Sequence, residues 1–161
     1  MLPSFQNRRR FSDLKEQEVL ALAISAEEDD GRIYRSFAER LREDFPATAR
    51  VFDGMAEEED EHRRRLIDLH RKRFGDVIPL IRREHVAGFY ARKPIWLIEN
   101  LSLEAAREQA SDMERQAEQF YLRAAQSTTD ADTRKLLGDL AAAEAGHQTA
   151  ADDLSAEHLT E

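Results

Sequence analysis

The chain has 161 residues and no cysteine, and its 33 acidic side chains outnumber its 24 basic ones, which gives a formal net charge of −9. The lack of cysteine excludes disulfides, thiolate-ligated zinc, rubredoxin-type iron and thiol catalysis. The acidic balance disfavours nucleic-acid binding, because phosphate contacts need a basic surface, and it suits a protein that attracts cations. We expect one domain spanning residues 1–161.

The first residues and the hydropathy of the chain predict the cellular location of the protein. No apolar run approaches the roughly 18 residues that suggest a membrane span. Residues 1–10 carry positive charge but are not followed by the apolar stretch of a signal peptide. We therefore expect a cytoplasmic protein.

Two long helices are predicted in the first half, where apolar residues recur at steps of three or four. The first is expected over about 12–45, with Ser12 as its cap and Pro46 as its end. The second is expected over about 47–74, ended by Gly75. The inner face of the first comprises Leu20, Ile24, Glu27, Gly31, Tyr34, Ala38, Leu41 and Phe45, and that of the second Phe52, Met55, Glu59, His62, Leu66 and Leu69.

Residues 75–101 break this pattern and are expected to form a long crossover. Pro79 and Pro94 interrupt it, and a short helix plus a traversing segment fits the remainder. Phe89, Tyr90 and Trp96 are bulky and apolar. Because four helices do not readily cover such residues, we expect a homodimer or larger assembly.

Two more helices are predicted over about 102–126, capped by Ser102, and about 130–158, after the turn at 127–130. Their inner faces comprise Ala106, Ala110, Glu114, Ala117, Tyr121 and Ala124, and then Leu137, Leu140, Glu144, His147, Ala151 and Leu154. The predicted fold class is therefore all-α. It is a four-helix bundle of two antiparallel helix pairs joined by one long crossover.

Each predicted inner face carries a glutamate near its middle: Glu27, Glu59, Glu114 and Glu144. A buried carboxylate is costly to ionise unless it is paired or binds a metal. One such residue is easily explained by a wrongly assigned face, but four at the centres of four helices are not. The alternative without a metal is that these are surface acids in salt bridges with histidines on the same helix faces.

Two of the glutamates begin a Glu-x-x-His motif, at Glu59–His62 and Glu144–His147. Three positions on a helix place both side chains on one face. Glu59 follows Glu27 by 32 positions and Glu144 follows Glu114 by 30, so the two halves repeat. Seven residues after the other two glutamates stand Tyr34 and Tyr121, which are either core residues or hydrogen-bond donors to a ligand carboxylate.

The six residues predict a site for two metal ions. Four carboxylates balance two divalent cations, which makes a buried acidic cluster tolerable. Mixed oxygen and imidazole ligands favour iron, with manganese or zinc as substitutes, over magnesium or calcium. The predicted metal ligands are Glu27, Glu59, His62, Glu114, Glu144 and His147.

These motifs resemble the ferritin-like superfamily and, within it, the rubrerythrin branch, whose di-iron bundles carry this constellation. The resemblance implies two Fe ions per chain and reaction with oxygen or hydrogen peroxide. Rubrerythrins carry a further carboxylate one turn from the third-helix ligand; here Ser111 lies one turn before Glu114, and Glu118 one turn after is the candidate. The rubredoxin module of rubrerythrins is missing.

The connection from Ile81 to Trp96 is also similar to that of membrane-bound ferritins, in which a rubrerythrin-like domain precedes a membrane domain of the vacuolar-iron-transporter type. That resemblance implies iron export coupled to a di-iron domain at the cytoplasmic face of the inner membrane. This chain would then be the soluble part alone, and membrane contact would come only through the missing C-terminal domain.

The leading functional hypothesis is that the chain binds and oxidises Fe(II) in iron homeostasis and peroxide tolerance. The alternative is a rubrerythrin-like peroxidase that reduces hydrogen peroxide with an external electron donor. A third reading is a helical interaction module whose acids are merely solvated. Whether the chain is an enzyme, with ferroxidase or peroxidase activity, stays open at the level of sequence.

Overall fold

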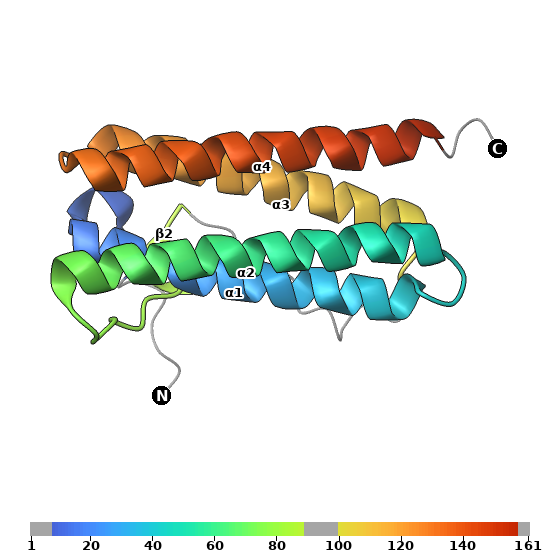
Figure 1. Ribbon diagram of the computed structural model, residues 1–161, viewed down its shortest axis with the longest axis horizontal. Helices are drawn as coiled ribbons and strands as arrows, with labels where there is room; N and C mark the ends of the chain where they lie inside the picture. The colour runs from blue at the N-terminus through green and yellow to red at the C-terminus, as the bar shows by residue number, and fades with distance from the viewer. Residues whose placement is uncertain (1–7, 89–99, 158–161) are drawn as a thin grey trace.

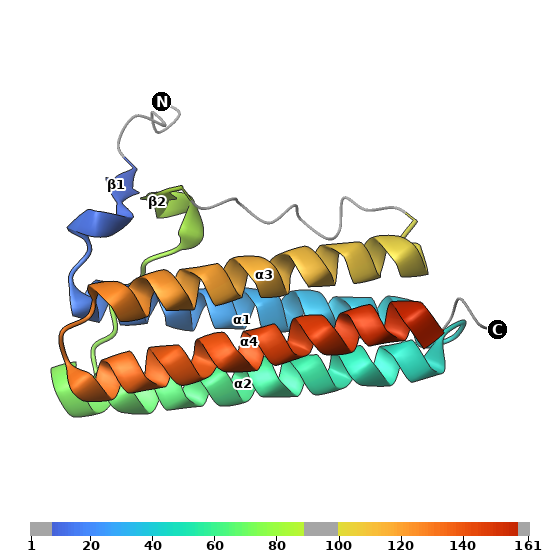
Figure 2. The same ribbon diagram turned by 90° about the horizontal axis from the view of Figure 1, so that it is seen from above.

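The computed structural model describes residues 8–88 and 100–157, and it describes side chains as far as residue 147. Four long helices form a bundle: α1 (Glu16–Leu41), α2 (Pro46–Phe74), α3 (Leu103–Ser127) and α4 (Ala131–Glu157). In Figure 1, α1 and α2 lie side by side below α3 and α4. Figure 2 shows the bundle from above, where α3 packs beside α1 and α4 beside α2. The predicted all-α four-helix bundle is confirmed.

The helix directions require a long connection between the two pairs. Within each pair the helices are antiparallel, and α2 ends at the opposite end of the bundle from the start of α3 (Figure 1). Residues 75–102 therefore join opposite ends. Their described part contains the short 3-10 helix η3 (Arg83–His85), and Phe89, Tyr90, Pro94 and Trp96 lie outside the described residues.

Helix α1 is shorter than the sequence pattern predicted. It begins at Glu16 rather than at about residue 12, because residues Phe11–Asp13 form the separate 3-10 helix η2. The backbone N–H of Lys15 donates to the Glu18 carboxylate, 3.1 Å away, and this contact caps the start of the helix. Helix α1 ends at Leu41 rather than Phe45, and Phe45 is partly exposed rather than on the inner face.

The other helix ends follow common capping chemistry. Pro46 stands in the first turn of α2, where its missing N–H costs nothing, and Gly75 at its end has φ +91°, which favours glycine. The Ser102 hydroxyl accepts from the Ala105 backbone N–H at 3.0 Å at the start of α3. The Asp130 carboxylate does the same for the Thr133 N–H at 3.0 Å.

Two short strands that the pattern did not predict attach the crossover to the start of the chain. Strand β1 (Arg9–Arg10) pairs in parallel with β2 (Val86–Ala87), with Arg9 opposite Val86. The buried side chains of Phe11 and Val86 anchor this pair to the core. The pairing holds residues 83–88 near α1, which matters for the site described below.

Two apolar clusters fill the ends of the bundle and leave its middle to polar groups. One cluster is built around Leu20, Leu22 and Leu140, and the other around Phe37, Phe52 and Met113. The glutamates of the four helices lie between them. This arrangement places the polar groups in rigid, well-packed surroundings.

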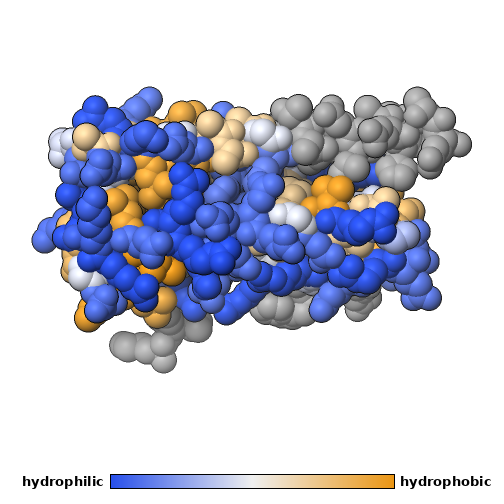
Figure 3. All heavy atoms as spheres, in the orientation of Figure 1, coloured by the Kyte–Doolittle hydropathy of each residue, from blue (hydrophilic) through white to orange (hydrophobic). Residues whose placement is uncertain are grey.

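The outer surface is mainly hydrophilic on the face that Figure 3 shows, with smaller apolar areas between charged side chains. Among the residues that the structure describes, none of the helices has the length and apolarity needed to cross a membrane.

Candidate metal centre

All six residues predicted from the sequence to bind metal are buried at the middle of the bundle. Each of the four helices contributes a glutamate, and α2 and α4 each add a histidine. The set is Glu27, Glu59, His62, Glu114, Glu144 and His147. Side chains that would be exposed on an isolated helix are thus enclosed together.

These side chains form two overlapping groups, each with four donor atoms that lie within 4.8 Å of one another. The first group is Glu27, Glu59, His62 and Glu144, and the second is Glu59, Glu114, Glu144 and His147. Glu59 and Glu144 belong to both groups. A carboxylate has two oxygens, so these two residues are placed to bridge a pair of cations.

The histidines point the same ring nitrogen into the cluster. Nδ1 of His62 lies 3.2 Å from Glu144 Oε1 and 3.6 Å from Glu27 Oε2. Nδ1 of His147 lies 3.2 Å from Glu114 Oε2 and 3.8 Å from Glu144 Oε2. Each imidazole thus presents a nitrogen among carboxylate oxygens, and mixed ligands of this kind suit iron, manganese or zinc.

The strongest sign that this cluster fits a cation is its unsatisfied atoms. Each of the six side chains has a fully buried polar atom that lacks a hydrogen bond of good geometry among the described residues. They are Glu27 Oε2, Glu59 Oε1, His62 Nδ1, Glu114 Oε2, Glu144 Oε1 and His147 Nδ1. Buried polar atoms normally form hydrogen bonds, so six that lack one in the same place are explained most simply by a metal ligand set.

The electrostatics of the metal-free cluster agree with this interpretation. Burial, together with the nearby Glu27, raises the pKa of Glu59 well above its usual value. Burial and a hydrogen bond to Glu114 raise the pKa of Glu144 in the same direction. Burial also acts on Glu114, but Glu144 and His147 outweigh it and lower that pKa. The cluster therefore retains protons unless a cation replaces them.

Two tyrosines brace the cluster by crossed hydrogen bonds. The Tyr34 hydroxyl donates to the Glu114 carboxylate, and the Tyr121 hydroxyl donates to Glu27. Each tyrosine therefore holds the glutamate of the other helix pair. Burial, and then the neighbouring glutamates, raise the pKa of both hydroxyls well above the usual value, so both stay protonated donors.

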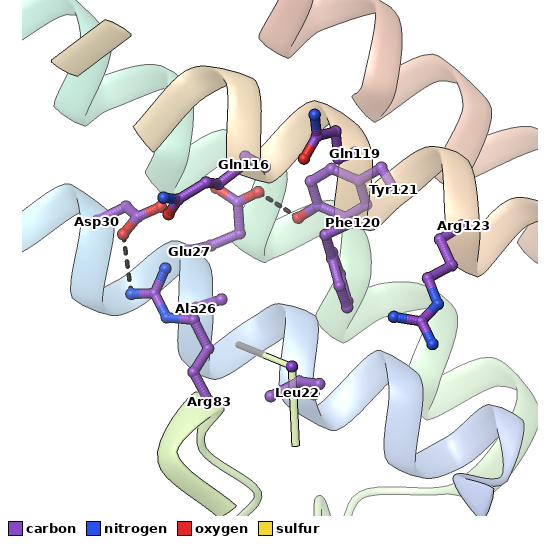
Figure 4. Close-up of a pocket in the computed structure, with 12 residues that line it drawn as sticks. Leu22, Ala26, Glu27, Asp30, Arg83, Gln116, Gln119, Phe120, Tyr121 and Arg123 are labelled. Atoms are coloured by element: carbon purple, nitrogen blue, oxygen red, sulfur yellow. Dashed lines mark hydrogen bonds and ion pairs between the residues drawn. The ribbon is translucent and has the colours of Figure 1, made fainter. Parts of the chain in front are cut away.

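Two residues beside the cluster were not singled out from the sequence. Asp30 follows Glu27 by one helical turn and pairs with Arg83 of the crossover, Oδ1 to guanidinium nitrogen 2.9 Å (Figure 4). Glu58 is largely exposed, and its carboxylate contacts Nε2 of His147. The three-residue step from Glu27 to Asp30 was a usable signal, whereas nothing local pointed to Glu58. Glu118 belongs to neither four-residue group.

Comparisons with known proteins agree with this architecture. The rubrerythrin family model matches residues 18–155. A solved structure of a hypothetical protein from Pyrococcus furiosus is similar, with a TM-score of 0.70, 24% sequence identity and 89% of each chain covered. At that identity the likeness supports the fold alone. No curated protein matches the chain.

Proposed function

This chain belongs to the rubrerythrin family, and we propose that it binds two iron ions between its four helices and oxidises Fe(II). Rubrerythrins typically bind two irons, and the buried acidic and histidine groups are compatible with that. The observation that carries the proposal is the set of six buried, unsatisfied ligand atoms on four helices.

In this proposal Glu59 and Glu144 would contribute to holding both ions, because both belong to each group of four donors. Glu27 and His62 would complete the residues that hold one ion, and Glu114 and His147 would complete those that hold the other. Bound iron would supply the one-electron redox chemistry, since the chain has no cysteine for thiol redox chemistry.

The surrounding residues hold the ligands and their protons. Tyr34 and Tyr121 keep Glu114 and Glu27 oriented, since each donates a hydrogen bond to one oxygen and leaves the other facing the cluster. The apolar clusters close the centre off at both ends of the bundle. The site is thus preorganised rather than assembled by the ligand.

Iron handling is the role that we favour. Hydrogen peroxide needs two electrons and two protons to become two waters, and two Fe(II) ions bound as substrate supply the electrons. The similarity of residues 81–96 to membrane-bound ferritins further suggests service to an iron exporter at the cytoplasmic face of a membrane. A homodimer stays a prediction, because Phe89, Tyr90 and Trp96, on which it rests, lie outside the described residues.

A rubrerythrin-like peroxidase is the second candidate, and family membership favours it. Sustained turnover would need electrons from outside, because the chain has no cysteine to hold a rubredoxin-type iron. Sustained turnover is therefore what separates the two candidates.

The test mixes Fe(II)-loaded protein with peroxide in a stopped-flow instrument, and separately follows steady-state peroxide consumption with a nicotinamide reductant alone. We expect rapid single-turnover oxidation and negligible sustained consumption. Rapid consumption without an added electron carrier would favour the peroxidase over iron handling. Absence of iron binding by the folded protein would refute both.

A further inference from the structure

A pocket of about 240 Å³ opens between α1 and α3 and reaches the candidate metal centre from one side. Glu27 and Tyr121, joined by their hydrogen bond, line its inner end, as Figure 4 shows. Glu27 is thus the candidate ligand whose outer side is in contact with this space. A small molecule in the pocket would lie one side chain away from the centre.

An ion pair between the crossover and α1 forms one wall of the pocket. The Arg83 side chain is 9% exposed and that of Asp30 is 6% exposed, and the guanidinium nitrogen lies 2.9 Å from the carboxylate. Arg83 also lies 3.9 Å from Asp29. A buried, paired guanidinium is held in one place, so this wall has a defined shape.

The lining is richer in hydrogen-bond donors than in free acceptors. Arg83 and Arg123 supply guanidinium N–H groups, and Gln116 and Gln119 supply amide N–H groups. Each of the two acids of the lining already accepts one hydrogen bond, Asp30 from Arg83 and Glu27 from Tyr121. The two guanidinium groups of the lining offset the charge of these two carboxylates, so the pocket does not attract a ferrous ion by net charge.

The remaining lining is mainly apolar, and it includes Leu22, Ala26, Ala117 and Phe120. An uncharged guest of a few atoms that accepts hydrogen bonds fits both the size and the chemistry. We propose that this pocket is the port through which hydrogen peroxide reaches the Glu27 side of the centre, while Fe(II) enters elsewhere. This inference rests on the proposed function and names the side from which its oxidant arrives.

The test blocks the port without touching a ligand. Ala117→Phe places a phenyl ring in the pocket, and Ala105→Phe adds the same ring at an exposed position on the same helix. Both variants should load two Fe(II) per chain, as wild type does. Oxidation by peroxide should then slow at least about tenfold in Ala117→Phe only.

A binding readout separates access from chemistry. Azide, a small hydrogen-bond acceptor, is titrated into the oxidised, iron-loaded proteins and followed by absorbance. Its association should slow by about the same factor in Ala117→Phe and stay unchanged in Ala105→Phe. If Ala117→Phe does not fold, Ala117→Leu serves, with a smaller effect in the same direction.

The outcomes are distinct. A blocked variant that holds two irons but reacts with peroxide and azide at the wild-type rates overturns the port and leaves the proposed function intact. A variant that loses iron uptake while Ala105→Phe retains it overturns the assignment of separate routes. A wild-type protein that takes up no iron refutes the proposed function itself.

Discussion

The imidazole rings of His62 and His147 lie almost parallel, with planes 9° apart and centroids separated by 5.9 Å, although they come from α2 and α4. Both Nδ1 atoms lie within 4 Å of the same carboxylate, that of Glu144. The pair reflects the approximate twofold repeat of the two Glu-x-x-His motifs. Each four-residue group contains one of the two histidines, so a substitution can be chosen that affects one metal position and not the other.

Glutamates shared by both groups should matter more for metal content than unshared ones. We expect Glu144→Gln to lose both iron ions, because Glu144 belongs to both groups, whereas Glu27→Gln should lose about one of the two. Elemental analysis after gel filtration measures this. The double variant Glu59→Ala with Glu144→Ala should bind none. Two irons retained in Glu144→Gln would show that the bridging assignment is wrong.

The metal-free protein should lose stability as pH rises. Burial raises the folded-state pKa of Glu144 well above the usual glutamate value, so its protonated form is fully accommodated below that usual value. Stability is lost as pH rises through the higher folded pKa, where a buried charge must form. Metal-free Glu144→Gln, which cannot ionise, should therefore melt higher than metal-free wild type at pH 8.

That difference in melting temperature should shrink toward pH 4. The exposed Glu108→Gln should show no such trend and serves as the control. Saturating Fe(II) should reverse the order by stabilising wild type, by about 2.7 kcal/mol at one hundred times the dissociation constant. A pH-independent difference would mean that Glu144 does not titrate in a buried cluster.

The two hydrogen bonds that the tyrosine hydroxyls donate to Glu114 and Glu27 can be removed one at a time. Tyr121→Phe leaves Glu27 without its donor, and Tyr34→Phe does the same to Glu114. Each should cost about 1–3 kcal/mol of stability in the metal-free protein and weaken iron binding roughly 10–100-fold. Calorimetry and Fe(II) titration measure the two effects. Unchanged affinity in both variants would leave the tyrosines as ordinary core residues.

Glu58 should support metal binding although it is exposed. Its carboxylate contacts Nε2 of His147, whose Nδ1 lies among the cluster's carboxylates, so we expect this contact to help hold the ring. Glu58→Gln should weaken iron binding by about tenfold, and the neighbouring exposed Glu57→Gln should not. Competitive chelator titration compares them. Equal affinities would assign Glu58 to the solvated surface after all.

Removing one partner of the Arg83–Asp30 ion pair should destabilise the fold, whereas replacing both partners with apolar residues should have little effect on stability. Arg83→Met leaves a buried carboxylate without its guanidinium and should destabilise the fold by about 3–5 kcal/mol. Adding Asp30→Leu should recover most of that loss, because both charges are then gone. Urea unfolding of the single and double variants tests this. No recovery in the double variant would indicate that the pair supports the fold through other contacts.

Several features of this protein were accessible from local patterns. The 3.6-residue period predicted four helices. The glutamate at the middle of each predicted inner face and the histidines of the two Glu-x-x-His motifs singled out six residues that the structure brings together. Both signals are local, because a helix places residues three or four apart on one face whatever packs against it. The start of α1 was placed too early, since the pattern could not distinguish Ser12 in a 3-10 turn from a helix cap.

The sequence by itself therefore determined the bundle and which side chains gather at its centre. Only the tertiary structure decided which glutamates are shared, that Tyr121 holds Glu27 across the bundle, and that Arg83 closes the pocket against Asp30. The physical reason is that these contacts join different helices or the crossover. They depend on how far each helix is shifted and rotated against its neighbours, and no spacing within one helix specifies that.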